Sequence, residues 1–251
     1  MHTDPVMFRR KETETMRKIA TIRTEFPQKF GIPRQSGLVP ELRGKIVFEP
    51  EYRQPEALRG LEGFSHIWLL WEFSQARRDT WSATVRPPRL GGNERIGVFA
   101  TRSPFRPNPI GLSSVRLEQI EWDTPEGPVL IVAGADLMDQ TPIYDIKPYL
   151  VYADCHPDAV DGFVREQKRH ELDVHMTPQQ REQVPPQKLE ALRQVLEQDP
   201  RPSYQQDPQR IYGMSFGGLD VRFRVEEDDL YVTEIKENDD EDIQKSIDIQ
   251  L

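Results

Sequence analysis

The chain has 251 residues, of which 36% are hydrophobic and 30% are charged, and its 42 acidic residues outnumber 33 lysines and arginines to give a net charge of −9. The longest purely apolar run, 67–71, is too short to span a bilayer, and the charged N-terminus lacks the apolar core of a secretory signal. A single cysteine and five histidines without metal-ligand spacing exclude a disulfide and argue against a zinc site, so we expect a cytoplasmic protein with no membrane or metal partner.

The first 150 residues carry the signals of β-strands. Apolar and polar residues alternate as in half-buried strands, and the run at 64–73 is continuously apolar and rich in aromatic residues. Glycine and proline separate these segments at short intervals, which is typical of an all-β sandwich or barrel. The expected strands are 18–26, 44–50, 64–73, 95–103, 113–122 and 127–137.

The pattern changes near Cys155, where a second unit is expected to begin. Thr177 and Gln180 have the spacing of a capping box with Pro178 at the first helical position, and the apolar residues of 187–200 fall on one helical face. Residues 170–176 favour a strand, and residues 219–235 alternate, turn and return as in a hairpin. The chain therefore divides into an extension (1–15), a mainly β domain (16–155), a small C-terminal α/β domain (156–236) and an acidic tail (237–251).

Charge is distributed unevenly along the chain. The last sixteen residues hold six acids and two lysines, whereas residues 75–106 hold seven arginines, two acids and no lysine. Arginine presents a planar fork that suits phosphate or carboxylate, so this arginine-rich stretch is a candidate contact for nucleic acid. A solvated basic face paired with acids elsewhere explains the charges equally well.

Four polar loops follow the predicted strands, at 33–39, 73–78, 100–111 and 136–150. In the third loop Arg106 and Asn108 each precede a proline, which restricts both to extended conformations. In the fourth loop Lys147 also precedes a proline, and Asp145 and Tyr149 add a carboxylate and a phenol. Turn chemistry explains each loop alone, but four rigid polar loops together favour a binding or catalytic site.

The usual sequence fingerprints of cofactor sites are missing. No G-x-G-x-x-G connects a predicted strand to a helix, and no serine lies in a nucleophile elbow. We therefore expect neither a Rossmann-type nucleotide site nor a serine hydrolase.

Two long stretches carry a family resemblance. Residues 84–115, TVRPPRLGGNERIGVFATRSPFRPNPIGLSSV, and residues 136–150, DLMDQTPIYDIKPYL, resemble the TsaA-like or YaeB-like (TrmO) tRNA methyltransferases, which methylate the exocyclic amine of threonylcarbamoyladenosine beside the anticodon. The resemblance covers most of the chain. It implies a β-barrel that binds S-adenosylmethionine without a Rossmann fold, a site at the interface of a homodimer, and a tRNA substrate, with tRNA-Thr expected.

The resemblance also implies which residues contact the methyl donor. The family often has glycine where Gln140 stands and a relative has histidine where Ser74 stands, and Gln140 fits if its backbone is not left-handed. By position the implied contacts are Gln35, Ser36, Gly37, Ser74, Gln75, Arg102, Leu117, Asp139, Gln140, Thr141 and Pro142.

Methyl transfer to a nitrogen of tRNA requires a group that accepts the proton which that nitrogen loses, and a protein surface that binds the RNA. Asp145 or Tyr149 is a candidate for the proton acceptor, and Lys147 and Asn108 complete the expected catalytic set. The candidate RNA contacts are Arg77, Arg78, Arg86, Arg106, Arg201 and Tyr204. We expect the C-terminal domain to bind RNA, so that a chain ending before His156 would still bind S-adenosylmethionine.

Two other classes of function fit the same residues. One is a non-catalytic RNA-binding or nucleotide-binding module, and the other is a regulator that senses S-adenosylmethionine. Transfer of a labelled methyl group to RNA separates an enzyme from both.

Overall fold

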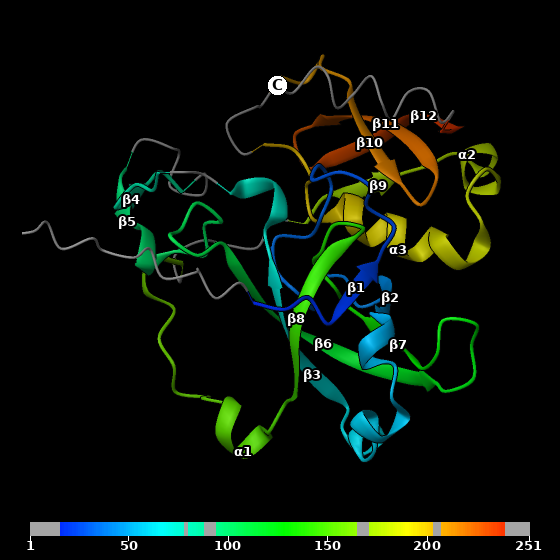
Figure 1. Ribbon diagram of the computed structural model, residues 1–251. Helices are drawn as coiled ribbons and strands as arrows, with labels where there is room; N and C mark the ends of the chain where they lie inside the picture. Colours follow the sequence, from blue (N-terminus) through cyan, green and yellow to red (C-terminus); the bar gives the residue numbers. More distant parts are fainter. Residues whose placement is uncertain (1–15, 78–79, 88–93, 165–170, 203–206, 239–251) are drawn as a thin grey trace, which may run out of the picture.

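The computed structural model describes residues 16–77, 80–87, 94–164, 171–202 and 207–238. Six antiparallel strands close into a barrel in the order β1-β2-β7-β6-β3-β8 (Figure 1), so the predicted mainly β domain is a barrel and not a sandwich. The strands are β1 (Ala20–Arg23), β2 (Arg43–Phe48), β3 (His66–Glu72), β6 (Ile110–Glu121), β7 (Val129–Ala133) and β8 (Thr141–Pro148).

Alternate residues of each strand fill the barrel interior. In β3, Ile67, Leu69 and Trp71 point inward and are at most 6% exposed. On the outer face Trp68 is half-buried, and its indole N–H donates to Asp154 at 3.0 Å. The apolar run 67–71 is continuous because Trp68 and Leu70 on the outer face of β3 are half-buried as well.

The strand predicted at 95–103 is not part of the barrel. Its first residues form β5 (Ile96–Gly97), which pairs only with β4 (Thr84–Val85), and a 3-10 turn, Val98–Ala100, follows. The expectation was wrong because Pro104, Pro107 and Pro109 follow closely and cannot donate ladder hydrogen bonds.

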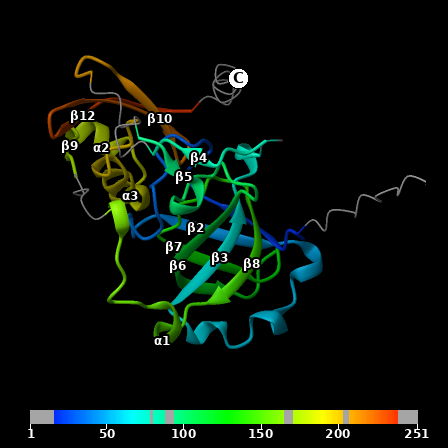
Figure 2. The same cartoon turned by 90° about the vertical axis from the view of Figure 1, so that its left-hand side faces the viewer.

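The barrel has two different ends. We call the mouth the end where β1, β3 and β7 finish, which carries the loops 24–42, 73–109 and 134–140. The opposite end carries three 3-10 helices, Pro50–Tyr52, Pro55–Leu58 and Leu61–Gly63, and the short α1 (Val151–Asp154). Figures 1 and 2 both show α1 at the end of the barrel away from the second sheet.

The C-terminal unit is a four-stranded sheet with two helices. The capping box of Thr177 and Gln180 is present, with Pro178 at the first helical position as predicted, and the predicted hairpin is β11-β12. The strand order is β10-β11-β12-β9, with β9 parallel to β12. The elements are β9 (Asp173–His175), α2 (Pro178–Glu182), α3 (Pro186–Glu197), β10 (Tyr212–Phe216), β11 (Leu219–Glu226) and β12 (Asp229–Glu237).

The two units share a hydrophobic core. Phe26, Val39 and Leu42 of the 24–42 loop are at most 3% exposed and pack in one cluster with residues of α3 and the second sheet. Glu25 forms an ion pair with Lys188 of α3 at 2.8 Å, and its carbonyl accepts the N–H of Gly217. The expectation that a chain ending before His156 still binds S-adenosylmethionine stays a prediction, and this shared core argues against it.

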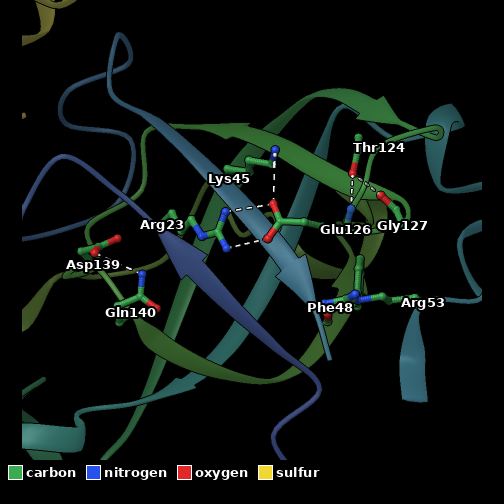
Figure 3. Close-up of polar contacts among 9 residues, drawn as sticks. All are labelled: Arg23, Lys45, Phe48, Arg53, Thr124, Glu126, Gly127, Asp139 and Gln140. Atoms are coloured by element: carbon green, nitrogen blue, oxygen red, sulfur yellow. Dashed lines mark hydrogen bonds and ion pairs between the residues drawn. The ribbon is translucent and has the colours of Figure 1, made fainter. Parts of the chain in front are cut away.

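A cluster of ion pairs around Glu126 lies on the outer face of β1 and β2 (Figure 3). Glu126, in the turn between β6 and β7, pairs with Arg23 through two hydrogen bonds of 2.6 and 2.9 Å and lies 3.7 Å from Lys45. The Thr124 hydroxyl shapes this turn by donating to the Gly127 carbonyl at 2.6 Å. These contacts fix the end of β1 beside the mouth.

Within the described residues, no helix is both long and apolar enough to cross a bilayer.

Candidate functional site

Two glycines let two mouth loops touch through their backbones. Gly37 and Gly134 both have positive φ angles, 77° and 76°, and the N–H of Gly37 donates to the Gly134 carbonyl at 2.8 Å. A Cβ on Gly134 would lie 3.2 Å from the Cα of Gly37. Only glycine allows this approach without strain, so the 24–42 loop is held tightly against the 134–140 loop.

The 73–109 loop joins the other two mouth loops through side chains. The guanidinium of Arg102 donates to the side-chain oxygen of Gln35, although Arg102 itself is exposed. Ser74 and Gln75 are exposed in a 3-10 turn, Ser74–Ala76, directly after β3. The structure thus brings Gln35, Arg102 and this turn to one end of the barrel.

A polar chain beneath these loops links the buried Ser113 and Trp71 to the half-buried Asp136. The Ser113 hydroxyl donates to the Asp136 carboxylate at 2.6 Å and accepts the indole N–H of Trp71 at 2.9 Å. Desolvation raises the pKa of the Asp136 carboxyl group, and the hydrogen bond from Ser113 opposes this rise. Trp71 fits here because its partner on β6 is Gly111, where a Cβ would clash with the indole ring.

Sequence reasoning missed Asp136, Ser113 and Trp71. Asp136 lies at the end of the strand predicted at 127–137, where the longest polar loop begins, and that position was a signal that could have singled it out. Ser113 and Trp71 gave no such signal, because they lie inside strands and meet only when the barrel closes.

The segment from Asp139 to Pro142 also lies at the mouth, where its polar groups hold the backbone. Asp139 accepts the N–H of Thr24 at 2.9 Å, and the buried Thr141 donates its hydroxyl to the Met138 carbonyl at 2.7 Å. Gln140 has a φ of 61°, so its backbone is left-handed. The expectation that Gln140 fits the position because its backbone is not left-handed is therefore wrong. A side chain in this conformation costs about 1–2 kcal/mol, which explains why glycine suits the position.

The other predicted residues lie along β6 and in or just after β8. Leu117 pairs with Val132, one residue before β7 finishes at the mouth, and its N–H donates to the Ser65 carbonyl. Tyr149 donates its N–H to the carbonyl of His66, where β3 begins. Lys147 pairs with Asp145 at 2.8 Å, and the two residues lie opposite Trp68 and Leu70 of β3. Asp145 lines a cavity of about 470 Å³ with Phe48, Tyr52 and Phe64 at the opposite end of the barrel.

Comparison with known proteins identifies the family. The profile of the tRNA-methyltransferase O N-terminal domain matches residues 21–155, and that of the TrmO C-terminal domain matches residues 169–238. The chain belongs to the tRNA-methyltransferase O family.

Relatives of this family are similar over nearly the whole chain. The tRNA (adenine(37)-N6)-methyltransferase of Escherichia coli is 42% identical over 83% of this chain and 92% of its own. A Pseudomonas aeruginosa protein named for S-adenosylmethionine-dependent methyl transfer is 45% identical over 87% of this chain and 95% of its own. The crystal structure of TrmO from Pseudomonas aeruginosa is 38% identical, with a TM-score of 0.73, over 89% of this chain and 99% of that chain.

Several arginines predicted to bind RNA have protein partners in this member of the TrmO family. Arg77 donates to the buried Glu72, which also accepts the Tyr144 hydroxyl, and Arg106 donates to the Thr101 carbonyl at 2.6 Å. The guanidinium of Arg77 is the main reason that the pKa of Glu72 is lowered.

The remaining candidate RNA contacts differ in accessibility. The Arg201 side chain is only 12% exposed and is paired with Asp199 at 2.8 Å, so it offers little surface to RNA. Arg86 is exposed just after β4. Arg78 and Tyr204 lie outside the described residues.

Proposed function

We propose that the mouth is the S-adenosylmethionine site of a tRNA (adenine(37)-N6)-methyltransferase that acts on threonylcarbamoyladenosine in tRNA-Thr. Membership of the family makes the chain an S-adenosylmethionine-dependent tRNA methyltransferase. The contact between Gln35 and Arg102 carries the assignment of the mouth, because it joins two donor candidates that lie 67 positions apart.

The groups at the mouth suit this donor chemically. The Arg102 guanidinium matches an α-carboxylate, and the backbone groups of the 35–37 turn offer donors and acceptors to an adenosine. When bound, S-adenosylmethionine would supply an electrophilic methyl group: the acceptor nitrogen would bond to the methyl carbon, S-adenosylhomocysteine would leave with the sulfur–carbon electron pair, and the nitrogen would lose its proton to a base of the protein. The chain's residues align the two reactants, and alignment contributes up to about 7–11 kcal/mol in the best cases.

The position of the expected proton acceptors favours a homodimer with a shared site. Asp145 lies four residues and Tyr149 eight residues along the chain from Thr141 at the mouth, which corresponds to about 13 and 26 Å of extended chain. Reacting atoms must approach within about 3–3.5 Å. We therefore assign Asp145, Lys147 and Tyr149 to the donor site of the partner subunit, and Asn108 to the donor site of its own.

An exposed apolar surface beside the mouth supports this assembly. Five large apolar residues are 37–71% exposed, and they lie in the 73–109 loop and at the start of β6. Trp81 and Phe99 are in contact, with ring centroids 6.0 Å apart, and exposed apolar patches mark interaction sites. This surface consists of Trp81, Phe99, Phe105, Ile110 and Leu112.

The acceptor base is part of the anticodon loop, where an unpaired base is splayed out at low cost. We assign its flanking phosphates to Arg86 and to the exposed side of Arg77, whose side chain is 69% exposed although it is paired with Glu72. Arg106 supports the loop that presents them.

A single assay tests this function and separates it from the two alternatives. The purified protein receives S-adenosylmethionine with a labelled methyl group and either of two preparations of tRNA-Thr, one with and one without the threonylcarbamoyl group. We expect transfer only to the first. Transfer to both would remove the threonylcarbamoyl requirement, and donor binding without transfer to either would favour a sensor.

A further inference from the structure

The cavity at the end of the barrel opposite the mouth has a size and a lining that suit a nucleoside. Its volume is about 470 Å³, and small-molecule sites in proteins typically measure about 300–1,000 Å³. It lies between the 3-10 helices of residues 50–63 and the ends of β2 and β8. Most of its lining is apolar, and three of the lining residues are aromatic, namely Phe48, Tyr52 and Phe64.

The walls of this cavity are fixed by buried side chains and by backbone hydrogen bonds. Phe48 and Leu58 are each 6% exposed. The guanidinium of Arg53 donates to the Phe48 carbonyl at 2.9 Å (Figure 3), and the N–H of Tyr52 donates to the Glu49 carbonyl at 2.8 Å. The cavity is therefore formed before a ligand arrives, which lowers the entropic cost of binding.

Two charged residues of opposite sign line the cavity. Asp145 of β8 pairs with Lys147 at 2.8 Å, and its other carboxylate oxygen accepts the N–H of Ile146 at 2.9 Å. Arg59 follows the 3-10 helix Pro55–Leu58, and its exposed guanidinium has no ion pair or hydrogen bond with any residue that the structure describes. A guanidinium without a protein partner at the wall of a cavity has all its donors available to an anionic group of a ligand.

The expected acceptor, threonylcarbamoyladenosine, matches both parts of this lining. Its adenine is a flat ring that packs on aromatic side chains such as Phe48 and Phe64. Its threonyl group ends in a carboxylate, which a guanidinium binds through two parallel hydrogen bonds. Asp145, a candidate acceptor for the proton that the methylated nitrogen loses, lines the same cavity.

We propose that this cavity is the acceptor pocket, which binds threonylcarbamoyladenosine of the tRNA, and that Arg59 is a specificity-determining residue that binds the threonyl carboxylate. This inference rests on the proposed function, in which Asp145 serves the donor site of the partner subunit. The acceptor in the cavity of one subunit then faces the methyl donor in the mouth of the other. A symmetric dimer contains two such composite sites.

Two substrates compared in two proteins test the role of Arg59. One substrate is tRNA-Thr with threonylcarbamoyladenosine, and in the other the threonyl carboxylate is converted to a carboxamide, which removes its charge. The wild type should methylate the first with a kcat/KM about 10–100-fold higher, as for loss of a hydrogen bond to a charged group. In Arg59→Met the two values of kcat/KM should differ by less than about threefold, because no cation remains to distinguish the substrates.

The preference between these substrates also separates recognition from a structural role. A structural arginine would lower kcat/KM for both substrates by the same factor and leave the preference unchanged. Arg181→Met is the matched control, because Arg181 is an exposed arginine of α2 in the C-terminal unit. It should keep the preference of the wild type for the carboxylate.

A second variant and a measurement on the wild type test the cavity itself. Ala57 lines the cavity from an exposed position, so Ala57→Trp fills part of the space without disturbing the core. It should lower kcat/KM for the natural substrate at least about tenfold by displacing the acceptor, and leave the affinity for S-adenosylmethionine unchanged. In the wild type, the free nucleoside threonylcarbamoyladenosine should shift the NMR signals of the Phe48 and Phe64 rings.

Three results would overturn the inference. They are a wild-type preference for the carboxylate in Arg59→Met, full activity in folded Ala57→Trp, or unchanged Phe48 and Phe64 signals at a nucleoside concentration that inhibits methyl transfer to tRNA. The last can be observed even if neither variant folds. Failure of the proposed function looks different, because the wild type itself would then not methylate tRNA-Thr that carries the threonylcarbamoyl group.

Discussion

Gln140 is held in a backbone conformation that suits glycine better. Its φ of 61° costs about 1–2 kcal/mol, and glycine loses about 0.5–1 kcal/mol more entropy on folding, so Gln140→Gly should stabilise the protein by about 0.5–1 kcal/mol. For a chain of this size we expect the melting temperature to rise by about 2 °C, measured by calorimetry. Glu227→Gly, at a second positive φ far from the mouth, is the matched control. A fall in stability only at Gln140 would mean that its 3.2 Å contact with Asp139 outweighs the strain.

Glu72 makes stability depend on acid pH. Its pKa is lowered chiefly by Arg77, so its contribution to stability is present above the ordinary pKa of 4.5 and is lost as pH falls through the folded pKa. In Arg77→Gln burial remains and the cation is gone, so the acid-side loss should begin at a higher pH. Urea midpoints measured from pH 7 to 3 check this. Tyr144→Phe, which keeps Arg77, should shift the profile less, and identical profiles for Arg77→Gln and wild type would contradict the role of Arg77.

At the scale of elements, the 24–42 loop belongs to both units. Removing residues from 156 onward would expose Phe26, Val39 and Leu42, and burial of each large apolar side chain is worth about 1.5–3 kcal/mol. The loop that carries Gln35 and Ser36 would then lose its support. We therefore expect a chain of residues 1–155 to bind S-adenosylmethionine much more weakly than the full protein, as measured by calorimetry.

A milder change separates this support from general stability. Lys188→Met keeps the packing of the side chain on α3 but leaves Glu25 without its partner, so donor affinity should fall. Arg193→Met removes ion pairs with Glu190 and Glu197 on the same helix, which do not involve the loop, and should leave donor affinity unchanged. Full donor affinity in both Lys188→Met and the chain of residues 1–155 would show that the shared core does not support the site.

At the scale of the whole molecule, the proposed homodimer predicts a pattern of complementation. If Arg102 and Asp145 reach one site from different subunits, Arg102→Ala and Asp145→Ala are each inactive alone. Mixed dimers then regain one intact site each, so an equimolar mixture should recover about a quarter of wild-type activity.

The control for this mixture uses two residues of one mouth. Arg102→Ala mixed with Asp139→Ala should recover nothing, since both side chains lie at the mouth of the same barrel and each site receives one defect. Recovery in the control, or none with Asp145→Ala while light scattering shows a dimer, would overturn the shared site.

The sequence by itself determined the local structure and the family. Alternation predicted β1, in which Ala20 and Ile22 are buried, and the spacing of Thr177, Pro178 and Gln180 placed the start of α2, because strand faces and helix caps depend on residues only a few positions apart. Long motifs likewise identified the family without any knowledge of contacts.

Only the tertiary structure decided which residues share a site. Leu117 pairs with Val132 near the mouth end of β7, its N–H reaches the Ser65 carbonyl just before β3, and the register between β6 and β7 shifts between Leu117 and Gln119. Asp136, Ser113 and Trp71 meet only because β3, β6 and β7 close into one barrel, and Phe26 is buried by a helix that begins 160 positions later. Such contacts depend on pairing between distant strands, and a local pattern carries no information about the register in which they pair.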